Sequence, residues 1–343
     1  MTLLTNGRLI TRDSEGKGYY EHGAVAYEGA SIVEVGEEAA LRAKYPEAEI
    51  IDAKGGVIMP ALINAHTHIY SALARGLSIV GNNPTNFYEV LDGTWWAIDR
   101  HLMMDGTRAS ATALYMDSIK QGVTTIFDHH ASYGEIPGTL FTISEESHRL
   151  GLRSCLCYEV SDRDGEEKCL QAIKENADFI TECEQRKDPM LAAMFGGHAL
   201  FTISDKTFDR MVEANNGRTG YHIHVSEGMN DVYDSLQNYG RRPVQRLQDH
   251  GILGEKTILG HCIHVNTAEM EIIKETGTMV VNNPESNMGN AIGICPVIQL
   301  YKRGILLGMG TDAYTNDMLE SIKVALCSQR SQNCLPNVGW CEV

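Results

Sequence analysis

The sequence lacks a long hydrophobic run, a paired cysteine motif and an excess of basic residues. None of its 343 residues belongs to an apolar stretch near the ~20 residues that a helix needs to cross a bilayer. The 9 cysteines are scattered without a CxxC pair, which favours reduced cysteines in a cytosolic protein. The opening MTLLTNGRLITRDSEG has too short an apolar run and no basic leader for a signal peptide. These absences predict a soluble cytoplasmic protein.

Positive charge is also scarce. Lys and Arg number 29 against 45 Asp and Glu, for a formal net charge of -16. Such a field repels phosphate backbones and anionic lipid. We therefore expect a small-molecule substrate, and neither a nucleic acid nor a membrane as partner. Charge alone leaves homo-oligomerisation open.

The first 56 residues predict a small β module. Short apolar runs are separated by turn signals such as Asn6-Gly7 and Gly55-Gly56, a pattern typical of strands in hairpins. Residues 37–45 predict a short helix that Pro46 stops. We assign residues 1–56 to this module and residues 57–343 to a second domain.

From residue 57 onward, predicted strands alternate with predicted helices, which indicates parallel strands joined by crossover helices. The predicted strands end near residues 68, 128, 159, 195, 225, 260, 282 and 310. Eight such units close a (β/α)₈ TIM-like barrel, an α/β fold whose active face lies at the C-terminal ends of the strands. The loop at residues 78–95 is long enough to form a lid or a pocket wall.

The first of these strands lies in the stretch VIMPALINAHTHIY, residues 57–70. Alternate side chains of a strand share a face, so His66 and His68 can bind one ion together. Two histidines in so apolar a setting are costly unless hydrogen-bonded or ligated. The alternative is a pair of core histidines that each bond a carbonyl group.

Polar residues at the ends of other strands extend this site. His224 lies on the fifth strand and Asp312 follows the eighth, so both could join His66 and His68 around a metal. Zinc-type ions take histidine nitrogens and carboxylate oxygens and leave one position for water in catalytic sites. A bound ion lowers the pKa of that water toward ~7, which supplies a nucleophile at neutral pH.

Two further groups could act beside such an ion. Glu227 lies three residues after His224 and could shuttle a proton, while His261 could orient the attacking water. His222 shares the strand face of His224 and could replace it as a ligand, although only His224 has a glutamate three residues on.

Several other polar or aromatic residues have two interpretations. His129 and His130 follow the second strand and could line a pocket or be structural histidines. Trp95 and Trp96 could stack on a flat heterocycle or simply pack locally. Asn287 could cap a turn.

The ordered motifs resemble the amidohydrolase superfamily, in its branch of cytosine, guanine and S-adenosylhomocysteine deaminases and triazine hydrolases. The motifs are His66-Thr67-His68, His224-Val225-Ser226-Glu227, Gly260-His261, Asn283-Pro284-Glu285-Ser286-Asn287 and Gly310-Thr311-Asp312. Within that branch, NAHTHIYSALARG, FDHHAS and NNPESNMGNA look most like the SsnA aminohydrolases.

The resemblance implies a role for each matching residue. The implied metal ligands are His66, His68, His224 and Asp312. The implied catalytic residues are Glu227, His261 and Asp312, and His198 matches a substrate-contacting histidine. Relatives with two metals bridge them through a lysine on the fourth strand. Residues 190–198 contain no lysine, which favours one divalent ion, Zn or Fe.

The function implied by the resemblance is hydrolytic deamination of an amino-substituted nitrogen heterocycle. Hydrolytic dechlorination or cyclic-amide hydrolysis could use the same ligands. Family members commonly continue well past the aspartate strand, whereas this sequence stops at Val343. We therefore expect a barrel truncated after its eighth strand and a β-sandwich module without its C-terminal half, which leaves unpaired strand edges. The alternative from a different functional class is a truncated relative of the family that has no catalytic activity.

Overall fold

The chain divides into two units, Met1–Ala61 and Leu62–Val343, in a computed structural model that describes residues 1–340 and 342. Unit one is a single five-stranded sheet with one helix. Strand β1 pairs with β2 in an antiparallel manner and with β4 and β5 in a parallel manner, and β3 pairs with β2. The elements are β1 (Thr2–Ile10), β2 (Tyr19–Glu28), β3 (Ser31–Glu37), α1 (Glu38–Lys44), β4 (Glu49–Asp52) and β5 (Val57–Ile58).

The core of this sheet is small. Leu3, Ala24 and Ala26 pack against Leu41 of α1. The expected sandwich is wrong for the described residues, because they form one sheet with a helix rather than two sheets. The unit also ends five residues later than the predicted 56, because Val57 and Ile58 pair with β1.

The second unit is built on parallel strands. They form a four-stranded sheet in the order β6-β7-β8-β9 and a five-stranded sheet in the order β10-β11-β12-β13-β14. The strands are β6 (Leu62–Thr67), β7 (Val123–His130), β8 (Arg153–Tyr158), β9 (Leu191–Ala193), β10 (Phe195–Ala199), β11 (Tyr221–Val225), β12 (Ile258–His261), β13 (Met279–Asn282) and β14 (Leu307–Met309).

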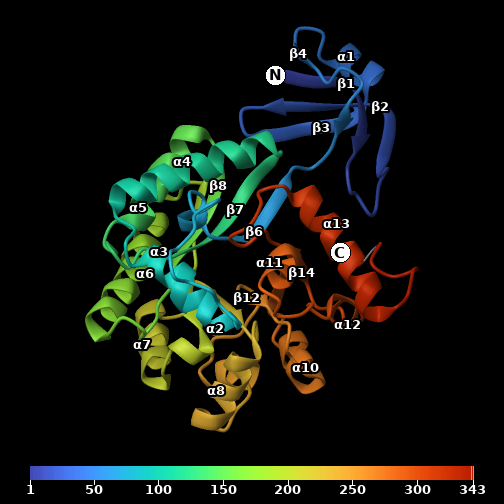
Figure 1. Cartoon of the computed structure of the whole chain (residues 1–343). Coiled ribbons are helices and arrows are strands. Elements are labelled where there is room, and N and C mark those ends of the chain that lie inside the picture. The colour runs from blue at the N-terminus through green and yellow to red at the C-terminus, as the bar shows by residue number, and fades with distance from the viewer. Residues whose placement is uncertain (341, 343) are drawn as a thin grey trace. The chain divides into compact units, whose positions relative to one another are not determined.

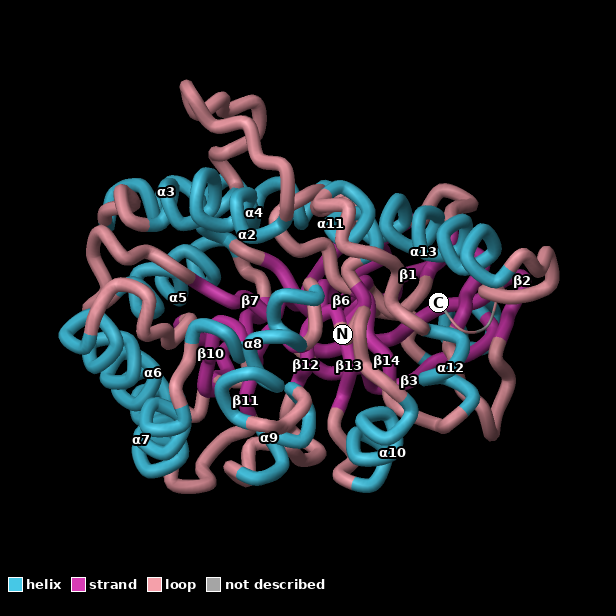
Figure 2. The backbone as a smooth tube through the Cα atoms, turned by 60° about the horizontal axis from the view of Figure 1, so that its bottom comes forward, coloured by secondary structure: helices cyan, strands magenta, loops and turns pink. Residues whose placement is uncertain are grey.

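The two parallel sheets meet at both edges. A parallel bridge joins Thr67 to Asp312, and another joins Val160 to Gly197. Strands β9 and β10 are separated only by Met194 and together form the predicted fourth strand. The prediction of parallel strands alternating with helices is confirmed, and the closure is consistent with the predicted (β/α)₈ barrel. Figure 2 shows these strands in magenta with the cyan helices around them.

Hydrophobic burial explains why these segments form strands. All five residues of β10 and of β11 are buried. Parallel strands covered on both faces read as nearly continuous apolar runs rather than alternating ones. The large core cluster of this unit joins Ile126 of β7, Leu156 of β8 and Ile223 of β11 to side chains of the surrounding helices.

The helices follow the strands in the colour order of Figure 1. They are α2 (Phe87–Val90), α3 (Trp96–Asp99), α4 (Met104–Lys120), α5 (Thr139–Leu150), α6 (Glu166–Arg186), α7 (Asp205–Asn215), α8 (Met229–Tyr239), α9 (Pro243–Asp249), α10 (Thr267–Glu275), α11 (Pro284–Gly289), α12 (Val297–Lys302) and α13 (Met318–Asn333). Short 3₁₀ turns cover Ile69–Ser71 and Leu200–Thr202, and a π-helical turn covers Leu91–Trp95. No helix among residues 1–340 is long and apolar enough to span a bilayer.

Two segments differ from the sequence prediction. The expected loop at residues 78–95 is helical from Phe87 onward, where Asn86 caps α2 by accepting a hydrogen bond from the backbone N–H of Glu89. The expected end of the barrel after the eighth strand is also wrong, because α13 follows β14. Asp317 caps α13 by accepting from the N–H groups of Leu319 and Glu320.

Candidate metal and active site

The C-terminal ends of the parallel strands bring the predicted site residues together. His66 lies near the end of β6 and His68 follows that strand, while His224 lies on β11 and Asp312 follows β14. His68 Nε2 lies 3.2 Å from Asp312 Oδ1 and 3.3 Å from His224 Nε2. Donor atoms of His66, His68 and Asp312 form one group within 4.8 Å of one another, and those of His66, His224 and His261 form a second.

The backbone is shaped to allow this approach. A Cβ on Gly310 would lie 2.7 Å from the carbonyl oxygen of His66, so only glycine lets β14 pass so close to β6. Asp312 has a φ of 56° and donates its N–H to that carbonyl at 3.0 Å. His261 has a φ of 68°. Left-handed conformations of non-glycine residues cost of order 1–3 kcal/mol and cluster at functional sites.

Hydrogen bonds fix which histidine nitrogens face the centre. His68 Nδ1 lies 2.6 Å from the carbonyl oxygen of His129, which can only accept, so Nδ1 carries a proton and Nε2 is the nitrogen that faces Asp312 and His224. His66 Nδ1 lies 2.8 Å from His222 Nε2, and His66 Nε2 is buried without a hydrogen-bond partner in the described chain. His222 therefore hydrogen-bonds the Nδ1 side of His66, and His224 is the histidine of β11 whose Nε2 approaches His68.

The donor set fits a divalent metal. Three imidazoles and a carboxylate are the ligand types that zinc takes, and ligands at ~2.0–2.1 Å in a tetrahedral shell lie roughly 3.3 Å apart. The separations of 3.2 and 3.3 Å around His68 Nε2 match that spacing. A buried nitrogen with no partner, His66 Nε2, is satisfied by such an ion.

Electrostatics favour positive charge at this point. Burial alone lowers the pKa of His68, but the hydrogen bond and charge of Asp312 outweigh it and raise the pKa to about 9. Burial lowers the pKa values of His66 and His224 well below the ordinary value, and neighbouring histidines lower them further. The His66 and His224 imidazoles are therefore neutral, which is the form in which histidine binds a metal.

Glu227 and His261 lie beside the carboxylate of Asp312. His261 Nε2 is 3.4 Å from Asp312 Oδ2 and 3.6 Å from Glu227 Oε1. His261 Nδ1 lies 2.7 Å from the side-chain oxygen of Asn287, so Nδ1 donates and Nε2 faces the carboxylates with its lone pair. Burial, followed by the charge of Asp312, raises the pKa of Glu227 well above its ordinary value. These two effects favour the protonated form of the Glu227 carboxyl.

A cavity of about 30 Å³ lies above the centre and has room for about one water molecule. His198 lines it, as do Trp95 and Trp96 from the helical segment Phe87–Asp99. The tryptophans therefore belong to the pocket wall. His264 points elsewhere, because its Nε2 lies 2.9 Å from the carbonyl oxygen of Ile292.

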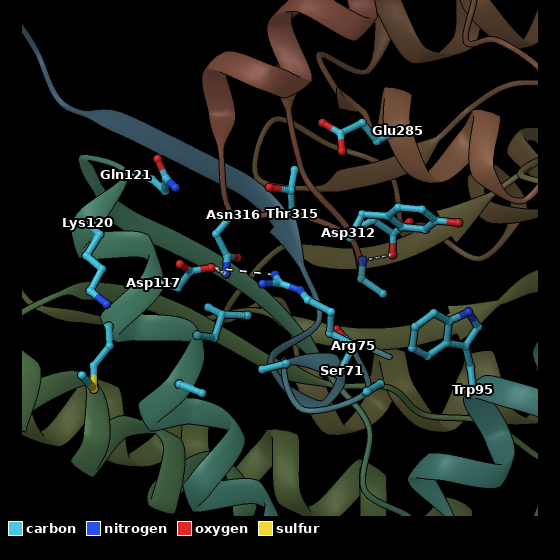
Figure 3. Close-up of a pocket in the computed structure, with 17 residues that line it drawn as sticks. Ser71, Arg75, Trp95, Asp117, Lys120, Gln121, Glu285, Asp312, Thr315 and Asn316 are labelled. Atoms are coloured by element: carbon cyan, nitrogen blue, oxygen red, sulfur yellow. Dashed lines mark hydrogen bonds and ion pairs between the residues drawn. The ribbon is translucent and has the colours of Figure 1, made fainter. Parts of the chain in front are cut away.

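An open groove of about 790 Å³ adjoins this cavity and shares Trp95, Asp312 and Tyr314 with it. Figure 3 shows Arg75 of this groove directed toward Asp117, with Nη2 and Oδ2 3.8 Å apart, and Trp95 on the far side. Asn316 donates to the same carboxylate at 2.9 Å. The groove is a route by which solvent reaches the neighbourhood of Asp312.

Sequence reasoning missed Glu159 and misjudged Asn287. Glu159 follows β8 and lines the cavity, where its Oε1 lies 3.3 Å from His129 Nδ1. It ends the predicted third strand, so the rule that polar residues at strand ends form the site would have found it. Asn287 does not merely cap a turn, because it orients His261. His130 is buried and bonds Ser132 within its own loop.

Comparison with known proteins identifies the family to which this chain belongs. The Amidohydrolase family matches residues 57–339, so the chain belongs to this family, and the predicted resemblance is confirmed. Residues 23–48 match the imidazolonepropionase-like composite domain of bacteria.

Among curated relatives, the chain is similar to 5'-deoxyadenosine deaminase of Methanosarcina barkeri, with 28% identity over 94% of this chain and 72% of the relative. It is also similar to 5-methylthioadenosine/S-adenosylhomocysteine deaminase of Pelotomaculum thermopropionicum, with 30% identity over 94% of this chain and 73% of the relative.

Two solved structures share the fold. An adenosine deaminase from Xanthomonas campestris with bound zinc gives a TM-score of 0.81 at 23% identity, covering 97% of this chain and 75% of the other. Atrazine chlorohydrolase TrzN from Arthrobacter aurescens, complexed with zinc, gives a TM-score of 0.82 at 22% identity, covering 98% of this chain and 78% of the other. With the matches covering almost all of this chain, the expectation of a missing C-terminal half finds no support in them.

Proposed function

We propose that this chain is a metal-dependent hydrolase that deaminates an amino-substituted nitrogen heterocycle. The observation that carries the proposal is the convergence of three imidazoles and the Asp312 carboxylate beside Glu227 and His261. The named activities of the curated relatives, which are deaminases of adenine-containing compounds, support the same reaction.

The proposed ligands of one divalent ion, zinc or iron, are His66, His68, His224 and Asp312. When bound, such an ion acts as a Lewis acid that makes a water molecule nucleophilic near neutral pH. The unpartnered Nε2 of His66 and the 3.2 Å approach of His68 Nε2 to Asp312 support this assignment.

The remaining residues move protons. Water adds to the ring carbon that bears the amino group, and the free Nε2 of His261, beside Asp312 Oδ2, is placed to accept the proton that the water loses. Glu227, whose raised pKa keeps it protonated, donates to the adjacent ring nitrogen. His261 then gives its proton to the amino group, which leaves as ammonia, while the remaining hydroxyl proton of the added water passes to Glu227 and the ring keeps a carbonyl oxygen. His198 on the cavity wall contacts the ring.

A heterocycle needs more room than the cavity offers. A space of about 30 Å³ holds roughly one water molecule, so we infer that the covering segment Phe87–Asp99 moves to admit substrate. The adjoining groove shares Trp95 and Tyr314 with the cavity, so displacement of these side chains would join the two spaces.

The test is reconstitution with zinc or iron followed by a screen of aminopurines, aminopyrimidines and pterins for released ammonia. Ammonia release that requires the metal supports the proposal. Turnover of chloro-triazines or cyclic amides with no deamination would contradict the proposed deamination and favour dechlorination or amide hydrolysis.

The non-catalytic alternative is tested separately. A chain that holds one metal ion and unfolds cooperatively contradicts it, and an aggregating metal-free chain supports it. The resemblance to the SsnA aminohydrolases, the cytoplasmic location and homo-oligomerisation stay predictions.

A further inference from the structure

Two turns at the ends of neighbouring strands hold the side chains of His198 and Glu227. The turn after β10, Leu200–Thr202, holds His198, because Thr202 Oγ1 lies 2.8 Å from His198 Nδ1. The turn after β11 carries Glu227, whose Oε1 lies 3.6 Å from His261 Nε2. Both side chains line the cavity. Because the turns follow different strands, the relative position of Glu227 and His198 depends on what joins the turns.

The carboxylate of Asp231 joins these two turns. Asp231 lies in the first turn of α8 and is only 2% exposed. Its Oδ1 accepts a hydrogen bond from the backbone N–H of Phe201 at 3.0 Å, and its Oδ2 accepts one from the N–H of Ser226 at 2.7 Å. Neither amide belongs to α8, so the carboxylate is not a cap of its own helix. One buried side chain therefore binds one amide of each turn.

The turn that carries Glu227 needs this support. Ser226 has a φ of 50°, a left-handed conformation that is unfavourable for a residue with a side chain. Its N–H is held by Asp231, and its carbonyl oxygen accepts a hydrogen bond from the N–H of His264 at 3.0 Å. Loss of the Asp231 acceptor would leave the N–H of the fully buried Ser226 without a partner. The strained turn would then relax, and the direction of Glu227 would change.

The turn that holds His198 is anchored at three points. Buried Arg246 of α9 donates from Nη1 to the carbonyl oxygen of Leu200 at 2.8 Å and from Nη2 to that of Ile203 at 2.6 Å. Asp231 supplies the third point through the Phe201 amide. The Phe201 ring lies with its centroid 6.0 Å from that of His198. The position of the His198 imidazole therefore depends on this turn.

We propose that Asp231 is a positioning residue that sets the relation between Glu227, the proposed proton donor, and His198, the proposed ring contact. The inference rests on the proposed function, because it uses the roles given there to both side chains. Asp231 is not among the described residues that line the cavity, so it acts through the two turns and does not touch substrate.

The first test is a double-mutant cycle on the zinc-loaded protein, with a heterocycle that the deamination screen identifies as substrate. D231N keeps the shape of the side chain but has one acceptor oxygen instead of two. We expect it to lower kcat roughly 10- to 100-fold, since a misplacement of about 1 Å can cost about 10²-fold. In an E227Q background the same change should lower kcat less than about threefold, because Glu227 no longer transfers the proton. A general loss of stability would lower kcat equally in both backgrounds.

The matched control is D234N. Asp234 lies one turn further along α8 and accepts a hydrogen bond from the side chain of Asn238 on the same helix at 2.8 Å. The substitution removes the same charge from the same helix and should leave kcat within about twofold of the wild type. Equal kcat losses from D231N in the two backgrounds would overturn the proposal. So would a loss in D234N as large as that in D231N.

The second test, hydrogen exchange followed by mass spectrometry, needs no substrate. In zinc-loaded D231N, segments 198–203 and 224–228 should both exchange roughly 10-fold or more faster than in the wild type, because the two turns are no longer joined. D234N should show neither change. Unchanged exchange in both segments of D231N, or faster exchange confined to α8, would overturn the proposal.

If D231N does not fold, D231E replaces it in both tests. The longer side chain keeps both acceptor oxygens but displaces them by one methylene group, so the same results are expected. A screen that finds no deamination sinks the proposed function, whereas the exchange measurement still decides whether Asp231 joins the two turns. The two failures are therefore distinguishable.

Discussion

Glu227 acts as a proton carrier in this account, because burial and the neighbouring Asp312 charge keep its carboxyl protonated. Substitution E227Q preserves its shape but removes the exchangeable acid. We expect kcat to fall roughly 10²- to 10⁴-fold while metal content is unchanged. The measurement is steady-state kinetics beside metal analysis.

The matched control for that variant is E285Q. Glu285 lines the adjoining groove and accepts a hydrogen bond from Ser321. It should retain kcat within a few-fold of the wild type. Loss of metal from E227Q, or equal losses of activity in both variants, would contradict the assigned role.

His68 should make the stability of the metal-free protein depend on pH. Its folded-state pKa of about 9 lies above the ordinary histidine pKa of about 6.5, so the proton it binds stabilises the folded state fully below about pH 6.5. That stabilisation is lost as pH rises toward 9.

The comparison of wild type with H68N isolates this contribution, because the other histidines are common to both. The difference in free energy of unfolding, from urea titrations of the metal-free proteins, should shrink between pH 6.5 and 9. A difference that stays constant over this range would show that Asp312 does not hold a proton on His68.

At the scale of elements, the short helix α11 orients His261. Asn287 on α11 accepts the proton of His261 Nδ1 at 2.7 Å, which leaves Nε2 free toward Asp312 and Glu227. We expect N287A to lower kcat by roughly 10- to 100-fold, the usual effect of removing an orienting partner. Its pH–rate profile should shift, since His261 loses a fixed tautomer.

Substitution N287D keeps an acceptor oxygen and should restore most of the activity. Met288, its neighbour on α11, is 51% exposed, so M288A should leave the kinetics unchanged. An N287A enzyme with wild-type kinetics and an unshifted pH profile would contradict the positioning role.

Strands and their polar ends were predictable because parallel strands buried on both faces leave a strong apolar signal. The strand ends predicted near residues 128, 225 and 282 lie within two residues of the observed ends of β7, β11 and β13. The helical segment Phe87–Asp99 was missed because Gly81, Pro84 and Gly93 dominate its local pattern, whereas its helices depend on packing of Leu91 and Trp96 and on the Asn86 cap.

Part of the candidate site could be assigned only from the three-dimensional structure. Strand alternation placed both His222 and His224 on one face, and only the 2.8 Å contact between His222 Nε2 and His66 Nδ1 separates the supporting residue from the central one. Glu159 could have been found from its place at the end of the predicted third strand. Its contacts with His68, His129 and His198 could not, because these residues lie at the ends of three other strands.

For the whole molecule, metal binding should couple to folding. The proposed ligands come from strand β6, the residue that follows it, strand β11 and the turn after β14, which only the folded chain brings together. A ligand that binds only the folded state stabilises it by about 2.7 kcal/mol at a free concentration 100 times Kd. Zinc should therefore raise Tm by several degrees, and D312N should abolish most of the rise.

Scanning calorimetry with and without zinc measures this coupling. N316D is a control, because Asn316 lies in the same turn and bonds Asp117 rather than the central histidines. It should retain the zinc-dependent shift. A zinc response in D312N equal to that of the wild type would exclude Asp312 as a ligand.

The proposed function requires that residues from the first, fifth and eighth strands bind one cation together. Anomalous scattering from crystals of the metal-loaded protein, recorded across the zinc and iron edges, tests it most directly. We expect a single peak within about 2.2 Å of Nε2 of His66, His68 and His224 and of a carboxylate oxygen of Asp312. A peak elsewhere, or one that leaves His224 or Asp312 unbound, would contradict it.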